Sequence, residues 1–211
     1  MERISMNKAL KIQAINRHRM QTDGNGVTTL IDLHGCQLNC KYCINKKLLH
    51  EYRYYDVPVD KLVDKLMIDY CYFIATGGGI TLGGGEPLLQ SESIIELKKK
   101  LPNNVKINIE TSLNVEQHML LDVIDFVDEL IIDIKSMNPE IYKRYTGKTI
   151  DKLVNNLEYI KEKGMQAKCK IRIPNIPNYT SKEDIEQTID IIKQLGFNNI
   201  DAFDYIIKSE K

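Results

Sequence analysis

The sequence has no excess of either charge and no long apolar run. Its 211 residues contain 29 Lys and Arg against 29 Asp and Glu, so no overall field would draw the protein to nucleic acid or to an anionic membrane surface. Residues 1–5 form no apolar signal region, and no uninterrupted apolar stretch approaches the length of a membrane span. We therefore expect a cytoplasmic protein without nucleic-acid or membrane partners.

The chain also lacks a break in composition. No stretch rich in proline, glycine or serine divides it, and a chain of this length can bury the core of one domain. We expect a single domain over residues 1–211, with an N-terminal extension of about residues 1–26, and a monomer.

Cysteine is scarce and unevenly placed. Of five cysteines, three fall within eight positions as Cys36, Cys40 and Cys43. An odd number of cysteines in a chain without an export signal favours metal ligation in a reducing compartment over disulfides. Cys71 lies in an apolar stretch and Cys169 in a run typical of a strand, so we expect both to be buried as small hydrophobic residues.

The three clustered cysteines directly follow the apolar run Val27–Ile31. Thiolates on one short loop converge without long-range closure, which is a usual way to hold an iron–sulfur cluster. No fourth cysteine or histidine follows at ligand spacing. A structural metal site is normally closed by four protein ligands, whereas a reactive site keeps one position for a small molecule. The C-x3-C-x2-C spacing therefore predicts a cluster with an open position, and the alternative is an incomplete zinc knuckle.

Hydrophobic periodicity predicts strands alternating with helices. The expected strands are 27–32, 80–82, 105–109, 130–132, 167–173 and 199–207, and the expected helices start at 58 and 91 or cover 115–123, 139–163 with a break near 147, and 181–195. Such βαβ units imply a parallel sheet. Because six units are two short of a closed barrel, we expect an α/β fold, an open (β/α)6 partial TIM barrel. Residues 4–16 fit either an edge strand or a segment that wraps the barrel end.

Polar or glycine-rich stretches end several of these strands. They are the cysteine loop, Gly83–Pro87, Glu110-Thr111, Asp133–Lys135 and Arg172. In a parallel barrel the chemistry lies where strands end and loops begin. We therefore expect these stretches to surround one mouth of the barrel.

Each stretch also has a plain structural explanation. Gly84 and Gly85 let a backbone approach an amino acid's ammonium and carboxylate, or simply form a tight turn. Asp133 and Lys135 alternate on a strand and suit a zwitterion, or are an ordinary surface pair. Glu110-Thr111 could bind a ribose or a monovalent cation, and its threonine could equally cap a helix. Arg172, at the end of the next strand, could pair with a ligand carboxylate or with a neighbouring acid.

Together these stretches resemble the glycyl radical enzyme activating enzymes of the radical S-adenosylmethionine (SAM) superfamily. Thr22–Gly26 resembles the T-x-D-G-x-G opening, and Cys36–Cys43 has the cysteine spacing with tyrosine before the last cysteine. Gly77–Gln90 is similar to the segment G-G-G-x-T-x-S-G-G-E-P-L-L-Q. Asp133–Lys135 matches a D-x-K strand end and Lys170–Pro174 the arginine strand. The likeness covers most of the chain.

The resemblance implies a [4Fe-4S] cluster and SAM, cleaved reductively to methionine and a 5′-deoxyadenosyl radical. That radical would take a hydrogen atom from a glycine of a partner glycyl radical enzyme, with flavodoxin or ferredoxin as reductant. The cofactors supply this chemistry, so no side chain need act as acid or base. The residues implied are Cys36, Cys40 and Cys43 for the cluster; Tyr42, Gly84, Gly85, Glu86, Lys135 and Arg172 for SAM; Glu110, Thr111 and Asp133 for a monovalent cation; and Asp23 for the target peptide.

The chain departs from the family pattern at four positions. Ile44 stands where many members have histidine, Gly83 replaces a serine, and Glu110 replaces an aspartate. Ile206 follows Tyr205 where the related pattern has a ribose-contacting histidine. No insert of extra cysteines follows the first motif. Two other functions stay open, a radical SAM enzyme acting on a small molecule or peptide, and a non-catalytic zinc-binding module.

Overall fold

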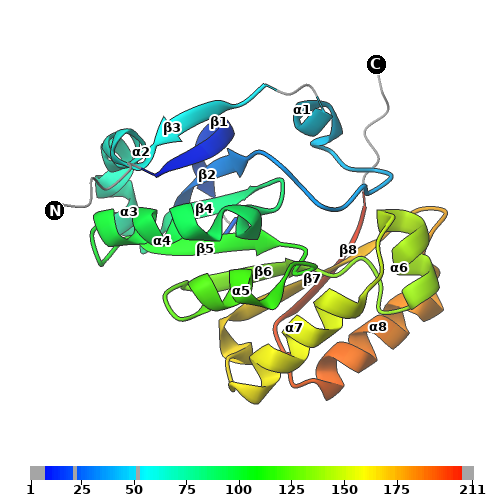
Figure 1. The fold of residues 1–211 in the computed structure, drawn as a ribbon. Helices are drawn as coiled ribbons and strands as arrows, with labels where there is room; N and C mark the ends of the chain where they lie inside the picture. Colours follow the sequence, from blue (N-terminus) through cyan, green and yellow to red (C-terminus); the bar gives the residue numbers. More distant parts are fainter. Residues whose placement is uncertain (1–7, 21–22, 51–52, 206–211) are drawn as a thin grey trace, which may run out of the picture.

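The computed structural model describes residues 8–20, 23–50 and 53–205. Their strands form one eight-stranded sheet in the order β3-β1-β2-β4-β5-β6-β7-β8 (Figure 1). The strands are β1 (Ala9–Met20), β2 (Val27–Leu33), β3 (Tyr55–Pro58), β4 (Gly79–Gly84), β5 (Lys106–Thr111), β6 (Glu129–Asp133), β7 (Cys169–Asn175) and β8 (Ile200–Asp204). Neighbours from β2 through β4 to β8 pair in parallel. The predicted open (β/α)6 partial barrel is confirmed.

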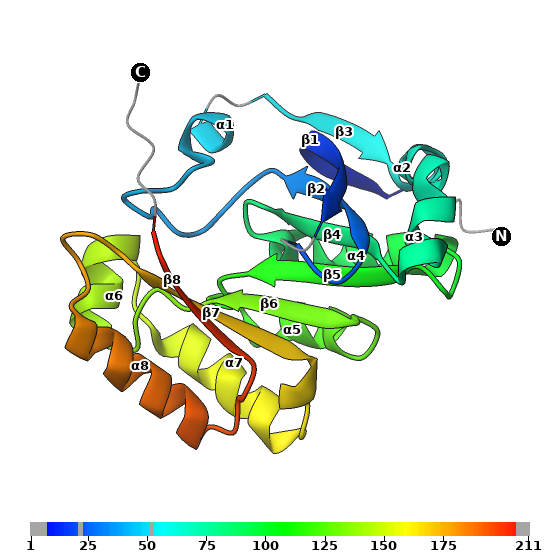
Figure 2. The same cartoon turned by 180° about the vertical axis from the view of Figure 1, so that it is seen from behind.

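Helices connect the parallel strands, and α4, α5, α7 and α8 cover one face of the sheet (Figures 1 and 2). The α-helices are α1 (Lys46–His50), α2 (Val59–Leu66), α3 (Tyr70–Thr76), α4 (Ser91–Lys100), α5 (Gln117–Ile124), α6 (Pro139–Thr146), α7 (Asp151–Glu162) and α8 (Lys182–Gln194), and the 3-10 helices are η1 (Met67–Asp69), η2 (Pro87–Gln90) and η3 (Gln166–Lys168). Fully buried side chains such as Ile80, Ile107 and Leu157 form the core between strands and helices. Burial of this apolar surface is the main force that holds the two layers together.

Local signals placed several helix ends correctly. Gly147 has φ 76 and separates α6 from α7, where the break was expected. Ser181 and Asp184 form a capping box at the start of α8: the Ser181 amide donates to the Asp184 carboxylate at 2.9 Å, and the Asp184 amide donates to the Ser181 hydroxyl at 3.2 Å. Within the described part of the chain, no helix has the length and apolar composition to cross a membrane.

The N-terminal part of the sheet was harder to predict. From residue 9 onward the chain forms β1, which pairs antiparallel with both β2 and β3. Of the two alternatives for residues 4–16 the strand is therefore correct from residue 9, although β3 covers its outer side; residues 4–7 lie outside the described residues. The expected burial of Cys71 is wrong, because this residue is exposed on α3, whereas Cys169 is buried as predicted. Thr22 and Ile206 also lie outside the described residues.

Candidate functional site

A cavity of about 380 Å3 opens where the parallel strands end. Most of the predicted site residues line it, and Tyr42 and Asp23 do not. The predicted residues in its wall are Cys36, Cys40, Cys43, Gly84, Gly85, Glu86, Glu110, Thr111, Asp133, Lys135 and Arg172. The expectation that these strand ends share one mouth is confirmed for them.

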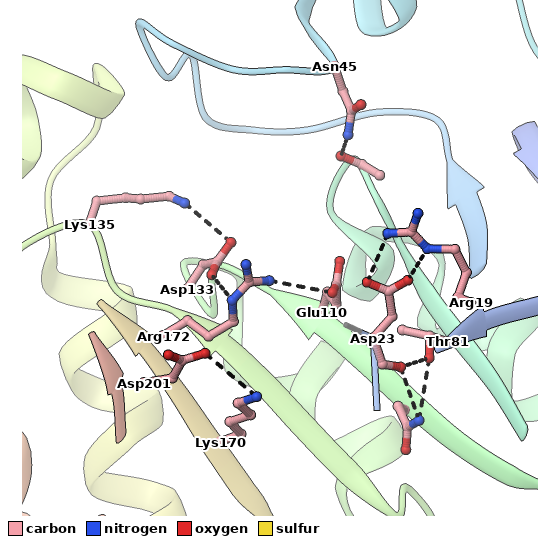
Figure 3. A network of polar contacts seen from close by, with 12 residues as sticks. Arg19, Asp23, Asn45, Thr81, Glu110, Asp133, Lys135, Lys170, Arg172 and Asp201 are labelled. Atoms are coloured by element: carbon pink, nitrogen blue, oxygen red, sulfur yellow. Dashed lines mark hydrogen bonds and ion pairs between the residues drawn. The ribbon is translucent and has the colours of Figure 1, made fainter. Parts of the chain in front are cut away.

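The cysteine loop between β2 and α1 is held on two sides. The Asn39 amide donates to the carbonyl oxygen of Thr146 at the end of α6, at 2.9 Å. The Asn45 side chain donates to the carbonyl oxygen of Gly84 at 2.8 Å (Figure 3). Because both contacts join the loop to distant parts of the chain, the tertiary structure sets the positions of the cysteines.

The three cysteines of this loop are free and partly buried. Burial raises the pKa of the Cys36 thiol to about 12, and the charge of Glu86 acts in the same direction. Burial also raises the pKa of Cys40, against the opposing charge of Lys135. A metal would therefore have to displace protons from these thiols.

The donor set suits a cluster better than a single ion. No three His, Cys, Asp or Glu side chains of the described residues are spaced for one metal ion. Thiolates of an iron–sulfur cluster bind different irons and need not meet at one point. Three cysteines in one cavity wall fit that requirement.

Gly84 and Gly85 lie where β4 passes under the cysteine loop. A Cβ atom on Gly84, whose φ is 86, would lie 2.8 Å from the Cα of Asp32, and one on Gly85 would lie 2.2 Å from the carbonyl oxygen of Gly35. The Gly85 amide donates to the carbonyl oxygen of Leu33 at 2.9 Å. Close packing therefore requires glycine at both positions. Because glycine has no side chain, this part of the cavity wall is exposed backbone.

Glu86 is buried with both carboxylate oxygens engaged. Its Oε1 accepts from the Thr111 hydroxyl at 2.6 Å, and its Oε2 accepts from the Ser112 hydroxyl at 2.6 Å and the Ser112 amide at 3.0 Å. Burial raises the pKa of Glu86, and these donors lower it. Glu86 therefore ties the end of β4 to the end of β5, and Ser112, which was not predicted as a site residue, holds it in place.

A chain of charged side chains crosses the inner face of the sheet (Figure 3). Lys135 Nζ lies 3.3 Å from Asp133 Oδ2, and Arg172 lies between two acids, 3.7 Å from Asp133 Oδ1 and 3.6 Å from Glu110 Oε1. The expectation that Lys135 belongs to the strand is wrong, because β6 ends at Asp133. Both residues nevertheless line the cavity.

Two oxygens of this chain, Glu110 Oε1 and Asp133 Oδ1, are buried and accept no hydrogen bond from the described residues. Burial raises the pKa of Glu110 to about 7, and the nearby charges of Asp133 and Asp23 add to this effect. Buried carboxylate oxygens normally have partners. The cavity therefore offers two acceptors to a ligand donor or a cation.

Three aromatic residues that were not predicted as site residues also line the cavity, namely Tyr145, Phe203 and Tyr205. Phe203 lies under Arg172, with 5.0 Å from the guanidinium carbon to the ring centroid. Tyr205 donates its hydroxyl to the carbonyl oxygen of Tyr42, and the ring of Tyr42 meets that of Tyr145 edge to face at 6.2 Å. The end of β8 and the residue after it could have predicted Phe203 and Tyr205, because the ends of parallel strands form the mouth, but no local pattern marks Tyr145.

Asp23 does not line the cavity and is 5% exposed. Its carboxylate accepts from Arg19, at 2.5 Å from Nε to Oδ2. Its carbonyl oxygen accepts from the Thr81 hydroxyl and from the Asn108 side chain, the latter at 3.4 Å (Figure 3). Asp23 is therefore not part of the cavity wall, although it lies near enough to Glu110 for its charge to raise the pKa of that residue.

Comparison with known proteins agrees with this arrangement. A family model described as the radical SAM superfamily matches residues 30–197. The chain belongs to the radical SAM superfamily. A [4Fe-4S] cluster and SAM are the cofactors that this superfamily uses, as the resemblance implied.

Relatives of this radical SAM chain include activating enzymes. The (2S)-3-sulfopropanediol dehydratase activating enzyme of Klebsiella oxytoca is 37% identical over 143 residues, covering 66% of this chain and 44% of the relative. A pyruvate formate-lyase-activating enzyme of Clostridium pasteurianum is 30% identical over 177 residues, covering 82% of this chain and 72% of the relative. The resemblance to activating enzymes of glycyl radical enzymes is confirmed.

The fold has matches among solved structures. Streptococcus suis SuiB bound to precursor peptide SuiA has a TM-score of 0.60 at 16% identity, covering 83% of this chain and 40% of SuiB. At this identity the likeness concerns the fold alone. The chain thus spans less than half the length of SuiB and of the Klebsiella relative.

Proposed function

We propose that this chain uses a [4Fe-4S] cluster and SAM to install a glycyl radical on a partner enzyme such as pyruvate formate-lyase. The observation that carries the proposal is the cavity in which Cys36, Cys40 and Cys43 share a wall with Lys135 and Arg172. The names of the relatives support a protein target. When bound, the cofactors supply one-electron reductive cleavage of SAM to methionine and a 5′-deoxyadenosyl radical.

The protein's own residues bind and orient the cluster and SAM and shield them from water. The three cysteines would hold the cluster, and the bare backbone of Gly84 and Gly85 with Glu86 would hold the amino end of SAM. Lys135 and Arg172 would attract its carboxylate, since both are cations in the cavity wall. The remaining assignments are Tyr42 to SAM, Glu110, Thr111 and Asp133 to a monovalent cation, and Asp23 to the target peptide.

Glu110 Oε1 and Asp133 Oδ1 support the cation assignment, because they accept no hydrogen bond from the described residues and have only the longer ion pairs with Arg172. The proposal also includes a single domain that acts as a monomer in the cytoplasm. Flavodoxin or ferredoxin is the proposed electron donor. Three partly buried free cysteines suit such a reducing compartment.

Anaerobically reconstituted protein tests the proposal. With SAM and dithionite it should form 5′-deoxyadenosine, and with a partner glycyl radical enzyme it should give a glycyl radical signal in electron paramagnetic resonance. Cys40→Ser should lose iron and sulfide together with both products, whereas Cys71→Ser, on an exposed helix, should keep them. A Cys40→Ser protein with full iron content and SAM cleavage would show the ligand assignment to be wrong.

Product formation and the metal content of the purified protein distinguish the two alternatives. Formation of 5′-deoxyadenosine without a glycyl radical on any partner would favour a small-molecule or peptide substrate. A colourless protein that carries zinc and no iron after anaerobic purification would favour the zinc-binding module.

A further inference from the structure

Strand β1 is irregular beside the candidate site. Its pairing with β2 passes from Asn16 opposite Leu30 to Arg19 opposite Thr28, so β1 contains one more residue than β2 over this step. His18, inside the irregular step, has φ 58, a conformation that is uncommon for a residue other than glycine. Such a β-bulge bends a strand and turns its side chains, and bulges are frequent next to active sites.

The bulge is held from the helix-covered side of the sheet. Arg17 Nε lies 2.8 and 3.0 Å from the two carboxylate oxygens of Asp69, and His18 Nε2 lies 3.0 Å from Asp69 Oδ1. The Thr29 hydroxyl donates to the same carboxylate at 2.9 Å. Asp69 itself is fully buried in η1. Two successive residues of β1 therefore face the same side, which a regular strand does not allow.

This irregularity turns Arg19 to the inner face. Residues three apart in a regular strand point to opposite faces. Here Asn16 and Arg19 both reach inner-face acids: Asn16 donates to Asp32 at 2.7 Å, and Arg19 donates to Asp23 at 2.5 Å from Nε and 3.4 Å from a terminal nitrogen (Figure 3). The bulge therefore places a guanidinium inside the open barrel.

Arg19 covers the carboxylate that was expected to contact the target. The side chain of Arg19 is 42% exposed, whereas that of Asp23 is 7% exposed. Asp23 takes two N–H donors from Arg19, and an arginine has five. A molecule entering from solvent therefore meets the guanidinium before the carboxylate, and that guanidinium still has N–H groups to donate.

The surroundings of Arg19 indicate which acceptor it would take. Its pKa is raised by the hydrogen bond that it donates to Asp23 and, to a smaller extent, by the charges of Asp23, Glu110 and Asp32. Asp23 and Asp32, together with Glu110 when it is ionised, surround one guanidinium with carboxylates, which disfavours a carboxylate ligand. Neutral peptide carbonyl oxygens accept hydrogen bonds without this repulsion. Glu110 lies both near Arg19 and in the cavity wall, so this position adjoins the site.

We infer that Arg19, oriented by Asp23 and by the bulge at His18, binds main-chain carbonyl oxygens of the glycine-bearing segment of the target. Asp23 is then a positioning residue that acts through Arg19. The inference rests on the proposed function. It assigns the contact with the target to a different residue from the one that the sequence motif indicates.

Synthetic heptapeptides with blocked ends and a central α-deuterated glycine test this inference. Transfer is measured as deuterium in 5′-deoxyadenosine by mass spectrometry, with iron content and the Kd for SAM measured on each variant to confirm a folded site. Arg19→Gln should raise the peptide KM about 10- to 100-fold, the loss expected for a hydrogen bond to a charged group. Arg19→Lys keeps the charge but lacks the planar set of guanidinium donors, and it should raise the peptide KM less than Arg19→Gln does.

Three further comparisons test the same assignment. Asp23→Asn should raise the peptide KM less than Arg19→Gln, because the guanidinium remains but is held less firmly. Arg53→Gln, at an exposed arginine outside the cavity wall, should behave as wild type. Peptides with aspartate beside the glycine should bind more weakly than peptides with asparagine there.

Several outcomes would overturn the inference. A peptide KM within about two-fold of wild type in Arg19→Gln, with a large rise in Asp23→Asn, would return the contact to Asp23. Tighter binding of the aspartate peptides would contradict the carbonyl assignment. Wild-type protein that cleaves SAM but takes no deuterium from any peptide or partner would contradict the proposed function and this inference together, whereas equal transfer by wild type and Arg19→Gln would contradict this inference alone.

Discussion

Two acids on opposite faces of the sheet, the buried Asp69 and the partly buried Glu110, differ in how they are paired. Asp69, on the side covered by helices, receives donors from Arg17, His18 and Thr29. The hydrogen bond from Arg17 is the main reason that the pKa of Asp69 is lowered. Glu110, at the cavity, has an oxygen that accepts no hydrogen bond from any described residue, and burial raises its pKa.

Asp69 is thus an acid whose hydrogen bonds stabilise the fold, whereas Glu110 keeps an oxygen that can accept a hydrogen bond from a ligand or bind a cation. A buried carboxylate with a full set of donors strengthens the structure, whereas one without them costs free energy until something binds. The Asp69 cluster orients β1, and the Glu110 oxygen is a place where a ligand or cation gains an interaction. Replacing each acid in turn tests this difference.

The largest effect is expected from Asp69→Ala. Removing the carboxylate leaves Arg17 and Thr29 without their partner and frees the bulge of β1. Because Arg17 is 43% exposed and can be hydrated, the free energy of unfolding should fall by roughly 2–4 kcal/mol. Urea unfolding of cluster-free protein measures it. Asp64→Ala, at an exposed position of α2, serves as the matched control and should change little. A loss no larger than that of the control would show that the Asp69 cluster does not hold β1.

Glu110→Gln should change how stability depends on pH. The pKa of Glu110 is about 7 in the folded protein against an ordinary 4.5, so the folded state keeps a proton that the unfolded state releases. Ionisation therefore costs the wild type stability as pH rises from about 4.5 to 7, on the order of 2 kcal/mol after solvent screening. Glu110→Gln should lack this loss.

The measurement is urea unfolding of both cluster-free proteins across this pH range. All other titrating groups are common to the two proteins, so the difference between the curves isolates Glu110. Parallel curves would show that Glu110 ionises as it does in water, and the contrast with Asp69 would fail.

Tyr205→Phe removes the hydroxyl that donates to the carbonyl oxygen of Tyr42. The free energy of unfolding should fall by about 1 kcal/mol, the usual value of one hydrogen bond. Amide hydrogen exchange should speed up in the cysteine loop, because this contact joins the loop to the end of β8. Tyr55→Phe, on an exposed tyrosine, should leave both measurements unchanged. Unchanged exchange in the Tyr205 variant would show that the loop is held without it.

The smallest effect is expected from Gly83→Ser. A Cβ atom on Gly83 would lie 2.9 Å from Glu110 Oε2 and 3.1 Å from a methyl group of Leu30. The flexible carboxylate can move, so the cost should be about 1 kcal/mol or less. Combining it with Glu110→Asp should reduce that cost, because the shorter side chain leaves room. Additivity within about 0.3 kcal/mol in this double-mutant cycle would show that the two departures from the family pattern are independent.

Much of the fold could be predicted because its signals are local. The parallel strands carry apolar residues in short runs or in alternation with polar ones, Gly147 adopts the left-handed conformation that ends α6, and the capping box at Ser181 starts α8. β3 escaped prediction because four largely exposed residues have no apolar pattern. Cys71 was misjudged because its apolar neighbours suggested burial, whereas its position on α3 faces solvent.

Some residues of the candidate site could likewise be predicted from local signals, whereas others depend on tertiary packing. Strand ends of a parallel sheet must lie at one edge, so the positions of Glu86, Glu110 and Arg172 followed from their places in the chain. Tyr145 reaches the cavity from a helix whose own sequence carries no sign of it, since only packing of α6 against the cysteine loop brings it there. Asp23 matched its motif, but its exposure depends on Arg19.

The sequence by itself determined the order of strands and helices, the three-cysteine loop and the set of polar strand ends, because periodicity and spacing are properties of the chain. Only the tertiary structure decided which carboxylate oxygens accept hydrogen bonds and which do not. The bulge in β1 shows why: Asp69 holds Arg17 and His18 on one side and so turns Arg19 to the other. Pairing between distant residues is a three-dimensional property, and here it sets that Arg19 faces the inner side of the open barrel.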